Sequence, residues 1–436
     1  MRKFSLHRGR TMTKPIWGII KDTVYGYIQV TYPIKEIIDT YPVQRLRRVR
    51  QLAGSEYVYI GATHCRFAHS LGVMHLAEQL IMNLAKSVEI NEDLVTTVKI
   101  AALLHDVGHG PFSHVFEALL LNDLDKTHED MTTWIVANSE IAEKLEKMNL
   151  DPNKMSLLAV GKLPLTEQRY LNQIISSAVD VDSLDYIVRD SQFTGAEYGF
   201  VDIFRLIYTL DVFNDELAVN MSALASLEAF LLARYESFKS IYFHKTSRAV
   251  QIMLEHAMDK AKDELGLLQY DTPDDYLKWD DYTTWAALRN SQNAKSIIED
   301  LERRKLIKVA YEQSSQIKNE VFSAILTKNR VRKQIEEEIA EKANVDPEFI
   351  WIDVPTLPSV PYHHSISLEP MEIPMFVETP NGEKIARRVT EVSDIIRVLK
   401  GFLNIVRVYT TPEYRDSVTK AAETVFGIPS SARISM

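Results

Sequence analysis

One short segment, residues 102–114, places the strongest constraint on how this chain folds. It reads Ala-Leu-Leu-His-Asp-Val-Gly-His-Gly-Pro-Phe-Ser-His, so one aspartate and three histidines follow an apolar helical stretch. Charged and imidazole groups at the end of a buried helix are costly unless they are paired. His105 and Asp106 offer a cation one nitrogen and one oxygen ligand, and His109 lies on the same face one turn later. The glycines and the proline end the helix and admit close approach by a ligand.

Helical periodicity dominates the first three hundred residues. Phe67, Leu71 and Met74 fall on one side of a helix, and a second apolar helix leads into His105. Residues 221–262 contain neither Pro nor Gly, which predicts one long helix preceded by a short hairpin at 214–219. A chain of 436 residues exceeds one ordinary core. We therefore expect a mainly α protein with a helical core and a smaller C-terminal α+β domain.

The character of the sequence changes near residue 305, which predicts domains of 1–305 and 306–436. Beyond this boundary we expect strands at 306–311, 349–354 and 405–409, a charged helix at 316–342 and a Pro-rich linker at 355–361. The C-terminal domain is expected to take part in oligomerisation.

Composition limits the class of protein. Hydrophobic residues make up 46% and charged residues 25%, a mixture typical of a globular protein. No apolar run reaches the length of a membrane span, and the basic N-terminus lacks the apolar stretch of a secretory signal. The single cysteine, Cys65, cannot form an internal disulfide, which agrees with a cytoplasmic location. The net charge of −10 argues against a general nucleic-acid partner.

Two further segments could complete a metal site with His105 and Asp106. One surrounds His69 and the other surrounds Asp182. Together the four residues resemble the H…HD…D pattern of the HD-domain superfamily. The resemblance implies that all four bind one divalent metal ion per subunit and that the helical core is an HD domain. Two imidazoles favour Fe, Mn, Zn, Ni or Co, whereas Mg would accompany the nucleotide.

The resemblance extends to one family within that superfamily. The motifs Gln44-Arg45-Leu46-Arg47, Gln51-Leu52, residues 61–72, residues 105–114, His128-Glu129 and residues 180–190 occur in order. They are similar to those of the deoxynucleoside triphosphate (dNTP) triphosphohydrolases of the SAM-and-HD-domain type, in the prokaryotic form without a SAM domain. The similarity covers residues 21–260 and continues more thinly to the C-terminus.

The resemblance also assigns roles to individual residues. It implies a substrate site in which Arg66 and Arg234 bind phosphates, while the remaining members surround the sugar: Gln51, Leu52, Tyr186, Asp190 and Tyr242. It implies catalytic residues on the phosphate side: His109, His114, His128 and Glu117. Ser183 stands where the human relative has a lysine that touches phosphate, which removes one contact.

The chemistry of these residue types fits hydrolysis at the α-phosphorus. A bound metal lowers the pKa of a water molecule, and cationic side chains neutralise charge in the transition state. His114 could then protonate the leaving 5′-oxygen, since an ordinary histidine titrates near pH 6.5. The expected products are a deoxynucleoside and inorganic triphosphate.

A second nucleotide site is also implied by the resemblance. Asp39, Gln44 and Arg47 match positions that read guanine and its phosphates, and Lys245, Arg304 and Lys308 complete the site. Arg304 and Lys308 would come from a neighbouring subunit, so we expect a homotetramer activated by GTP or dGTP. Gly18 stands where the human relative has a phosphate-binding lysine. Alternatively, these charged side chains are simply solvated and Asp39 caps a helix.

Two other functions remain open at this stage. The chain could be an HD phosphohydrolase that acts on a nucleoside monophosphate, a cyclic dinucleotide or a guanosine alarmone. It could also be a catalytically inactive protein that senses nucleotides or binds nucleic acid. The sequence contains no GxxxxGK[ST] phosphate loop, which argues against a Walker-type NTPase.

Overall fold

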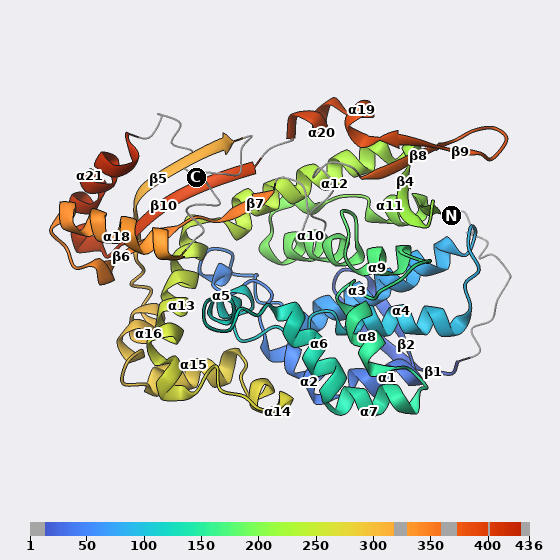
Figure 1. Ribbon diagram of the computed structural model, residues 1–436, viewed down its shortest axis with the longest axis horizontal. Coiled ribbons are helices and arrows are strands. Elements are labelled where there is room, and N and C mark those ends of the chain that lie inside the picture. Colours follow the sequence, from blue (N-terminus) through green and yellow to red (C-terminus); the bar gives the residue numbers. More distant parts are fainter. Residues whose placement is uncertain (1–13, 318–328, 359–372, 400–401, 429–436) are drawn as a thin grey trace.

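A computed structural model describes residues 14–317, 329–358, 373–399 and 402–428. Helices dominate it, as the sequence predicted, and a smaller part that contains strands follows toward the C-terminus (Figure 1). The fold class, a helical core with a C-terminal α+β region, is therefore confirmed. Within the described residues no helix is both long and apolar enough to cross a membrane.

The helical core extends from α1 to α16. The first part of the core comprises α1 (Tyr32–Ile38), α2 (Tyr41–Arg45), α3 (Arg66–Leu84), α4 (Glu92–Leu104), α5 (His114–Leu124), α6 (His128–Asn138), α7 (Glu140–Lys147), α8 (Pro152–Ala159), α9 (Tyr170–Ile175) and α10 (Val181–Thr194). The second part comprises α11 (Ile203–Thr209), α12 (Leu224–Ser237), α13 (Lys245–Leu265), α14 (Pro273–Leu277), α15 (Asp281–Asn290) and α16 (Lys295–Glu302).

Local signals explain where the central helices begin and end. Asn91 caps α4 through a hydrogen bond from Leu94, and Asp180 caps α10 in the same way. Thr127 and Asp130 form a capping box that starts α6. Gly195, in the left-handed conformation, ends α10. These caps fix the positions of the residues that immediately follow them.

The predicted long helix at 221–262 is wrong. The chain forms α12, then a π-helical turn at Phe238–Tyr242, and then α13 after a break at His244. Two distant side chains bond the backbone at this break: Arg407 donates to the Phe243 carbonyl and Tyr409 to the Lys245 carbonyl. The break is therefore set by tertiary contacts, since the sequence there contains no Pro or Gly.

Three small sheets accompany the helices. The N-terminal hairpin pairs β1 (Ile16–Asp22) with β2 (Gly26–Thr31). A four-stranded sheet contains β5 (Lys308–Ile317), β10 (Phe402–Thr410), β6 (Ile350–Asp353) and β7 (Thr356–Pro358). The other contains β3 (Leu210–Phe213), β4 (Glu216–Asn220), β8 (Pro374–Glu378) and β9 (Lys384–Arg388). The hairpin predicted at 214–219 is thus confirmed as β3 and β4.

The C-terminal region divides between two cores. The β5–β10–β6 sheet packs with α18 (Asn329–Ala343) and α21 (Arg415–Phe426) around an apolar cluster of its own. Residues 373–399, with α19 (Val389–Val392) and α20 (Asp394–Leu399), return to the helical core, where β8 pairs in parallel with β4 (Figure 1). The boundary at residue 305 stays a prediction about how the two cores separate.

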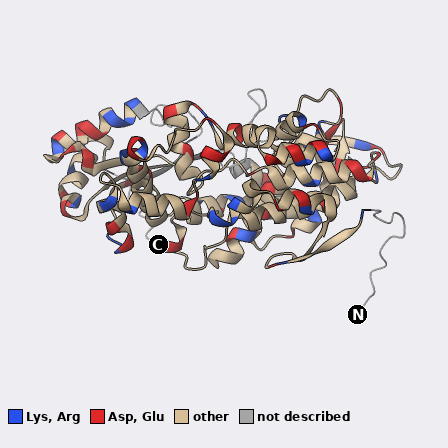
Figure 2. Cartoon of the chain, turned by 90° about the horizontal axis from the view of Figure 1, so that it is seen from below, with Lys and Arg blue, Asp and Glu red and all other residues tan. Residues whose placement is uncertain are grey.

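Two sequence expectations in this region need correction. The charged helix expected at 316–342 begins at Asn329, while residues 316–317 belong to β5 and 318–328 lie outside the described residues. Part of the expected Pro-rich linker is β7, which pairs with β10. Acidic and basic residues are interspersed along the chain (Figure 2).

Candidate active site

Four side chains from three helical segments converge in the middle of the core. His69 comes from α3, His105 and Asp106 from the end of α4, and Asp182 from the first turn of α10. The Nε2 atom of His69 lies 3.2 Å from Nε2 of His105 and 3.0 Å from Oδ1 of Asp182. Asp106 Oδ1 lies 3.3 Å from His105 Nε2. The first three residues form a group able to hold a metal ion.

The donor set of this cluster fits a divalent transition metal. Asp185 Oδ2 accepts the Nδ1 hydrogen of His69 at 2.7 Å, and the Ala102 carbonyl accepts that of His105 at 2.8 Å. Both imidazoles therefore turn Nε2 toward the cluster, with the tautomer set by the second nitrogen. Metal bonds of roughly 2.0–2.2 Å place neighbouring ligands about 3.0–3.5 Å apart, which matches these separations.

The electrostatics of the cluster favour a cation. Burial would lower the pKa of His69, but hydrogen bonds to Asp182 and Asp185 outweigh it and raise the pKa to about 10. Burial would raise the pKa of Asp106, but the charges of Arg66 and His105 hold it well below its usual range. The carboxylates thus stay ionised and attract positive charge, which protons or a metal ion can supply.

Arg66 connects the cluster with the segment that follows the His-Asp pair. It is buried at the start of α3, and its Nη1 donates to Asp106 Oδ2 at 2.5 Å. Its Nε donates to Ser113 Oγ at 2.6 Å, and Ser113 in turn donates to the Arg50 carbonyl. The guanidinium therefore lies beside a candidate metal ligand and ties it to the 105–114 segment.

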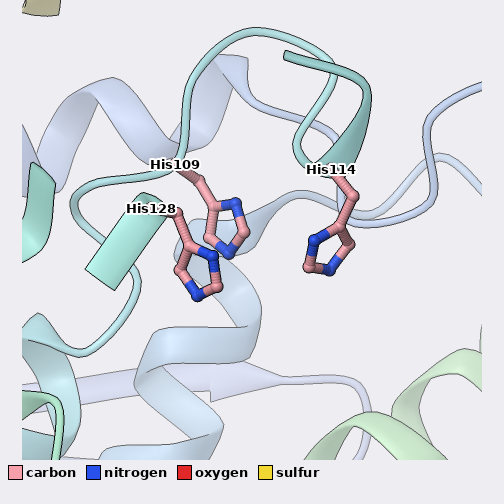
Figure 3. Close-up of side chains that lie close together, drawn as sticks. All are labelled: His109, His114 and His128. Atoms are coloured by element: carbon pink, nitrogen blue, oxygen red, sulfur yellow. The ribbon is translucent and has the colours of Figure 1, made fainter. Parts of the chain in front are cut away.

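Three further histidines, His109, His114 and His128, form a second cluster (Figure 3). It adjoins the first, since His109 Nε2 lies 3.3 Å from Asp106 Oδ1. The rings of His109 and His128 are stacked, with centroids 3.9 Å apart, and His114 stands edge-on to both. Glu117 accepts from Nδ1 of His128 at 2.5 Å and from Nδ1 of His114 at 2.8 Å. The His114 side chain is 69% exposed, whereas that of His109 is buried. The cluster therefore opens toward solvent on its His114 side.

The pKa values of the stacked His109 and His128 are shifted in opposite directions. Burial lowers the pKa of His109 well below its usual value, and the charges of Arg66 and His128 lower it further. Burial also opposes a charge on His128, but its hydrogen bond to Glu117 outweighs this and raises the pKa. Two parallel imidazoles thus favour opposite protonation states, which suits a site that moves a proton.

The loop that carries these histidines is held from several sides. Phe112 and Ser113 have positive φ values of 57° and 56°, in the region that L-residues rarely occupy. A Cβ on Gly108 would lie 2.1 Å from the His128 carbonyl, so only glycine admits the close approach of α6. Asp281 accepts from the backbone N–H of Phe112, and fully buried Arg45 donates to the carbonyl of His109.

The residues predicted around the sugar meet beyond the metal cluster. Tyr242 Oη donates to Asp190 Oδ2 at 2.6 Å, and the other Asp190 oxygen lies 2.7 Å from His64 Nε2. The Tyr186 ring stands edge-on to Tyr242 at 6.3 Å. Leu52 packs with Tyr242 in a small apolar cluster, and the buried Oε1 of Gln51 has no hydrogen-bond partner among the described residues.

Arg234 supplies a buried positive charge next to these rings. Its side chain is on α12, only 8% of the residue is exposed, and it lies 5.7 Å from the Phe238 ring. Its charge also acts on Tyr186 and Tyr242. Within the described part of the chain it makes no ion pair or hydrogen bond, and its Nε is buried without a partner. A buried guanidinium without an anion is costly, so this position calls for a negatively charged ligand.

The six residues predicted for the activator site lie on separate elements. Asp39 follows α1 and pairs with Lys35 at 2.7 Å. Gln44 accepts from Arg47, whose guanidinium lies 3.6 Å from the centre of the Phe67 ring. Lys245 is the first residue of α13, Arg304 follows α16, and Lys308 is the first residue of β5.

Comparison with protein families agrees with this geometry. The HD domain family matches residues 66–190, the stretch from Arg66 to Asp190 that includes the four predicted ligands. The HD associated region matches residues 201–435, more than half of the chain. The chain belongs to the HD-domain phosphohydrolase family. HD domains bind divalent metals, and the cluster of His69, His105 and Asp106 is compatible with such a site.

Relatives of this HD-domain protein cover most of its length. It is 28% identical over 405 residues to the protein YwfO of Bacillus subtilis. The aligned region covers 88% of this chain and 89% of that protein. It is 32% identical to the deoxynucleoside triphosphate triphosphohydrolase SAMHD1 homologue of Dictyostelium discoideum, over 66% of this chain and 57% of that protein. A phosphohydrolase from Bacteroides thetaiotaomicron has 25% identity and a TM-score of 0.71, covering 90% of this chain and 99% of the other.

Several residues of this HD-domain site were not found from the sequence. His64, Ser113 and Asp185 bond Asp190, Arg66 and His69 respectively. His64 and Asp185 lie within motifs already singled out, so their proximity was the available signal. Arg45 lies within the Gln44-Arg45-Leu46-Arg47 motif but was given no role, and no local pattern marks Asp281; both act through bonds that join distant segments.

Proposed function

We propose that this HD-domain phosphohydrolase hydrolyses dNTPs to deoxynucleosides and inorganic triphosphate. The single observation that carries the proposal is the buried, unpaired Arg234 beside Tyr186 and Tyr242, close to the family's metal-binding cluster. The charge requires an anion, and the rings provide flat apolar surface for a nucleoside. The similarity to a protein named as a deoxynucleoside triphosphate triphosphohydrolase supports the same substrate class.

In this proposal the metal ligands are His69, His105, Asp106 and Asp182. A divalent metal held by these residues would supply Lewis acidity and would lower the pKa of a water molecule. Arg66, next to Asp106, and Arg234 neutralise charge on the phosphates. His114 protonates the leaving 5′-oxygen, while Glu117 orients His114 and His128 through their Nδ1 atoms. His109 and His128 line the phosphate side of the substrate.

Sugar selection falls to Tyr242 in the same proposal. Its hydroxyl is tied to Asp190, and Asp190 is tied to His64, so the ring cannot swing aside at low cost. A fixed ring packed against C2′ rejects a 2′-hydroxyl by steric clash. We expect Tyr242→Ala to lower the ratio of dATP to ATP hydrolysis, measured as relative kcat/KM. An unchanged ratio would remove Tyr242 from the sugar pocket.

We also propose that a guanine nucleotide activates the enzyme at a second site built in a homotetramer. Asp39 would accept from N1 and N2 of guanine, a pairing that adenine cannot offer. Gln44 and Arg47 would contact the same nucleotide, with Lys245, Arg304 and Lys308 completing the site across subunits. Asp39 is bonded to Lys35 in the single chain, so the nucleotide would have to displace that lysine.

The decisive experiment is incubation of the purified protein with each dNTP and NTP, singly and mixed, with products separated by chromatography. We expect a deoxynucleoside and triphosphate. Release of a monophosphate, or turnover only of a cyclic dinucleotide or an alarmone, would assign a different phosphohydrolase reaction. If metal-loaded protein turned over no nucleotide, the result would favour a catalytically inactive protein that binds nucleotides or nucleic acid.

The activator is tested by measuring dATP hydrolysis with and without GTP or dGTP, together with sedimentation. We expect the guanine nucleotide to stimulate dATP hydrolysis by the wild type. Asp39→Ala should lose this stimulation. Full activity of a monomer on dATP alone would refute the activator site and leave the catalytic proposal intact.

A further inference from the structure

A buried chain of charged groups runs from the predicted metal ligand His69 to the N-terminal hairpin. Asp185 Oδ2 accepts both from His69 Nδ1 and from Arg189 Nε, each at 2.7 Å. Arg189 Nη2 donates to the other Asp185 oxygen at 3.0 Å, and Arg189 Nη1 donates to Asp22 Oδ2 at 2.9 Å. Asp185 and Arg189 are fully buried, and Asp22 is 8% exposed. Arg189 thus joins two carboxylates, one of which faces the metal cluster.

The hairpin fixes the far end of this chain. Asp22 is the last residue of β1, and its Oδ1 accepts from the backbone N–H groups of Val24 and Tyr25 in the turn. The ring of Tyr25 lies 5.7 Å from the Arg189 guanidinium. The carboxylate therefore cannot turn away from Arg189 without opening the hairpin.

The helix α3 leaves room for the same chain of groups. A Cβ on Gly72 would lie 2.0 Å from Asp185 Oδ1 and 2.4 Å from Arg189 Nη2. Gly72 is one turn after His69 on the same helix. The helix that presents the metal ligand is thus built without a side chain where the Asp185–Arg189 pair must pass.

We propose that Asp22 is a positioning residue for the metal centre: through Arg189 and Asp185, the N-terminal hairpin holds the imidazole of His69 in its metal-binding orientation. The residues that support a metal ligand fix both its tautomer and its direction, and their loss weakens metal binding. Without Asp22, Arg189 keeps one buried partner, so the Asp185 carboxylate is free to rotate with it. The inference concerns the metal centre alone and does not depend on which nucleotide is hydrolysed.

A matched pair elsewhere in the chain separates this role from simple stabilisation. Arg248 of α13 bonds both oxygens of buried Asp353 in β6, at 2.6 and 3.1 Å. The pair joins a helix to a strand, as Arg189 joins α10 to the hairpin, but it contacts none of the predicted metal ligands. Asp353→Asn is therefore a control with the same chemistry.

The experiment measures Mn²⁺ affinity in the full chain after chelator treatment, by the electron paramagnetic resonance signal of the free ion. Asp106→Ala identifies binding at the cluster, and thermal unfolding in chelator measures stability. Supporting groups typically change metal affinity by roughly 10–100-fold. We expect about tenfold weaker binding for Asp22→Asn, a larger loss for Asp185→Asn, and unchanged binding for Asp353→Asn. Asp22→Glu should recover part of the affinity.

Gly72→Ala gives an independent measurement, because it displaces the Asp185–Arg189 pair while every charge is retained. It should also weaken Mn²⁺ binding, so the proposal can be tested if Asp22→Asn does not fold. Wild-type affinity in folded Asp22→Asn or Gly72→Ala would overturn the proposal. So would equal weakening in Asp22→Asn and Asp353→Asn, which would show a general effect of stability, or Mn²⁺ binding that Asp106→Ala does not remove.

Discussion

The two histidine clusters stand side by side but differ in their carboxylates. The first joins His69 and His105 to Asp106 and Asp182, with Asp185 bonded behind His69. The second has three imidazoles around the carboxylate of Glu117, meets the first where His109 Nε2 lies 3.3 Å from Asp106 Oδ1, and opens to solvent at His114. Two carboxylates among two imidazoles suit a divalent cation, whereas a cluster composed mainly of imidazoles suits proton transfer beside an anion. We therefore expect the first cluster to hold the metal and the second to transfer protons.

The largest expected effect comes from the first cluster. Asp106→Ala should abolish both metal binding and hydrolysis, because it removes an oxygen ligand and leaves Arg66 unpaired beside the histidines. Metal content measured by mass spectrometry and turnover of dNTPs provide the test, with circular dichroism to verify the fold. Asp123→Ala, which removes a surface partner of Lys262, is the control. Normal turnover by folded Asp106→Ala would refute the proposed metal centre.

A smaller effect is expected in the second cluster. His114→Ala should retain its metal and lose roughly a hundredfold in kcat, the usual scale for a positioned acid. His256→Ala, an imidazole against Trp351 far from the site, should change neither quantity. If His114→Ala lost its metal instead, the two clusters would have to be regarded as one metal site.

The link between the imidazoles is tested by Glu117→Gln. The hydrogen bond to Glu117 raises the pKa of His128 against the effect of burial, so the pKa should fall when the charge is removed. If the reaction needs the protonated imidazole, activity falls as pH rises. In the variant this fall should occur at a lower pH than in the wild type. The measurement is kcat against pH, with metal content as the control. An unshifted profile would show that His128 does not hold the proton that matters.

The smallest effect concerns the support of the loop between the clusters. Burial raises the pKa of Asp281 to about 7, although it accepts from the N–H groups of Phe112 and Arg50. A folded pKa above the ordinary value near 3.9 means that the folded state binds the extra proton. The resulting stabilisation is complete below about pH 4 and is lost as pH rises through 7.

Unfolding by urea between pH 4 and 8 tests this prediction. Stability should decline with pH in the wild type, and Asp281→Asn should remove that part of the slope. The same variant should lower kcat modestly and leave metal binding unchanged, because His114 directly follows the 112–113 backbone, whereas the four predicted metal ligands come from other segments. Parallel pH profiles for the two proteins would contradict the assignment.

The sequence predicted the local parts of this molecule well. Apolar periodicity placed α3 and α4, and the His-Asp pair with its glycines identified the end of α4. The hairpin of β1 and β2 was missed because its apolar residues, such as Trp17 and Ile19, are exposed and follow no pattern of burial. The break at His244 was missed because Arg407 and Tyr409 impose it from far along the chain.

Within the site, too, the local features were predicted from the sequence and the long-range contacts were not. The predicted ligands lie in recognisable motifs, so their resemblance to a family was enough to propose them. Asp22 and Arg189 are 167 residues apart in the sequence, and their bond exists only once the fold brings them together. Long-range pairs of buried charges leave no period or spacing in the sequence.

The parallel pairing of β4 with β8 bears on how the chain folds during synthesis. Val219 pairs with Met375, so the second edge of β4 stays uncovered until the ribosome has delivered most of the C-terminal region. An exposed strand edge can pair with another nascent chain. The backbone hydrogen bonds within the core helices are local and can form early, whereas this closure must wait for β8. The C-terminal segment thus completes the sheet that the N-terminal part begins.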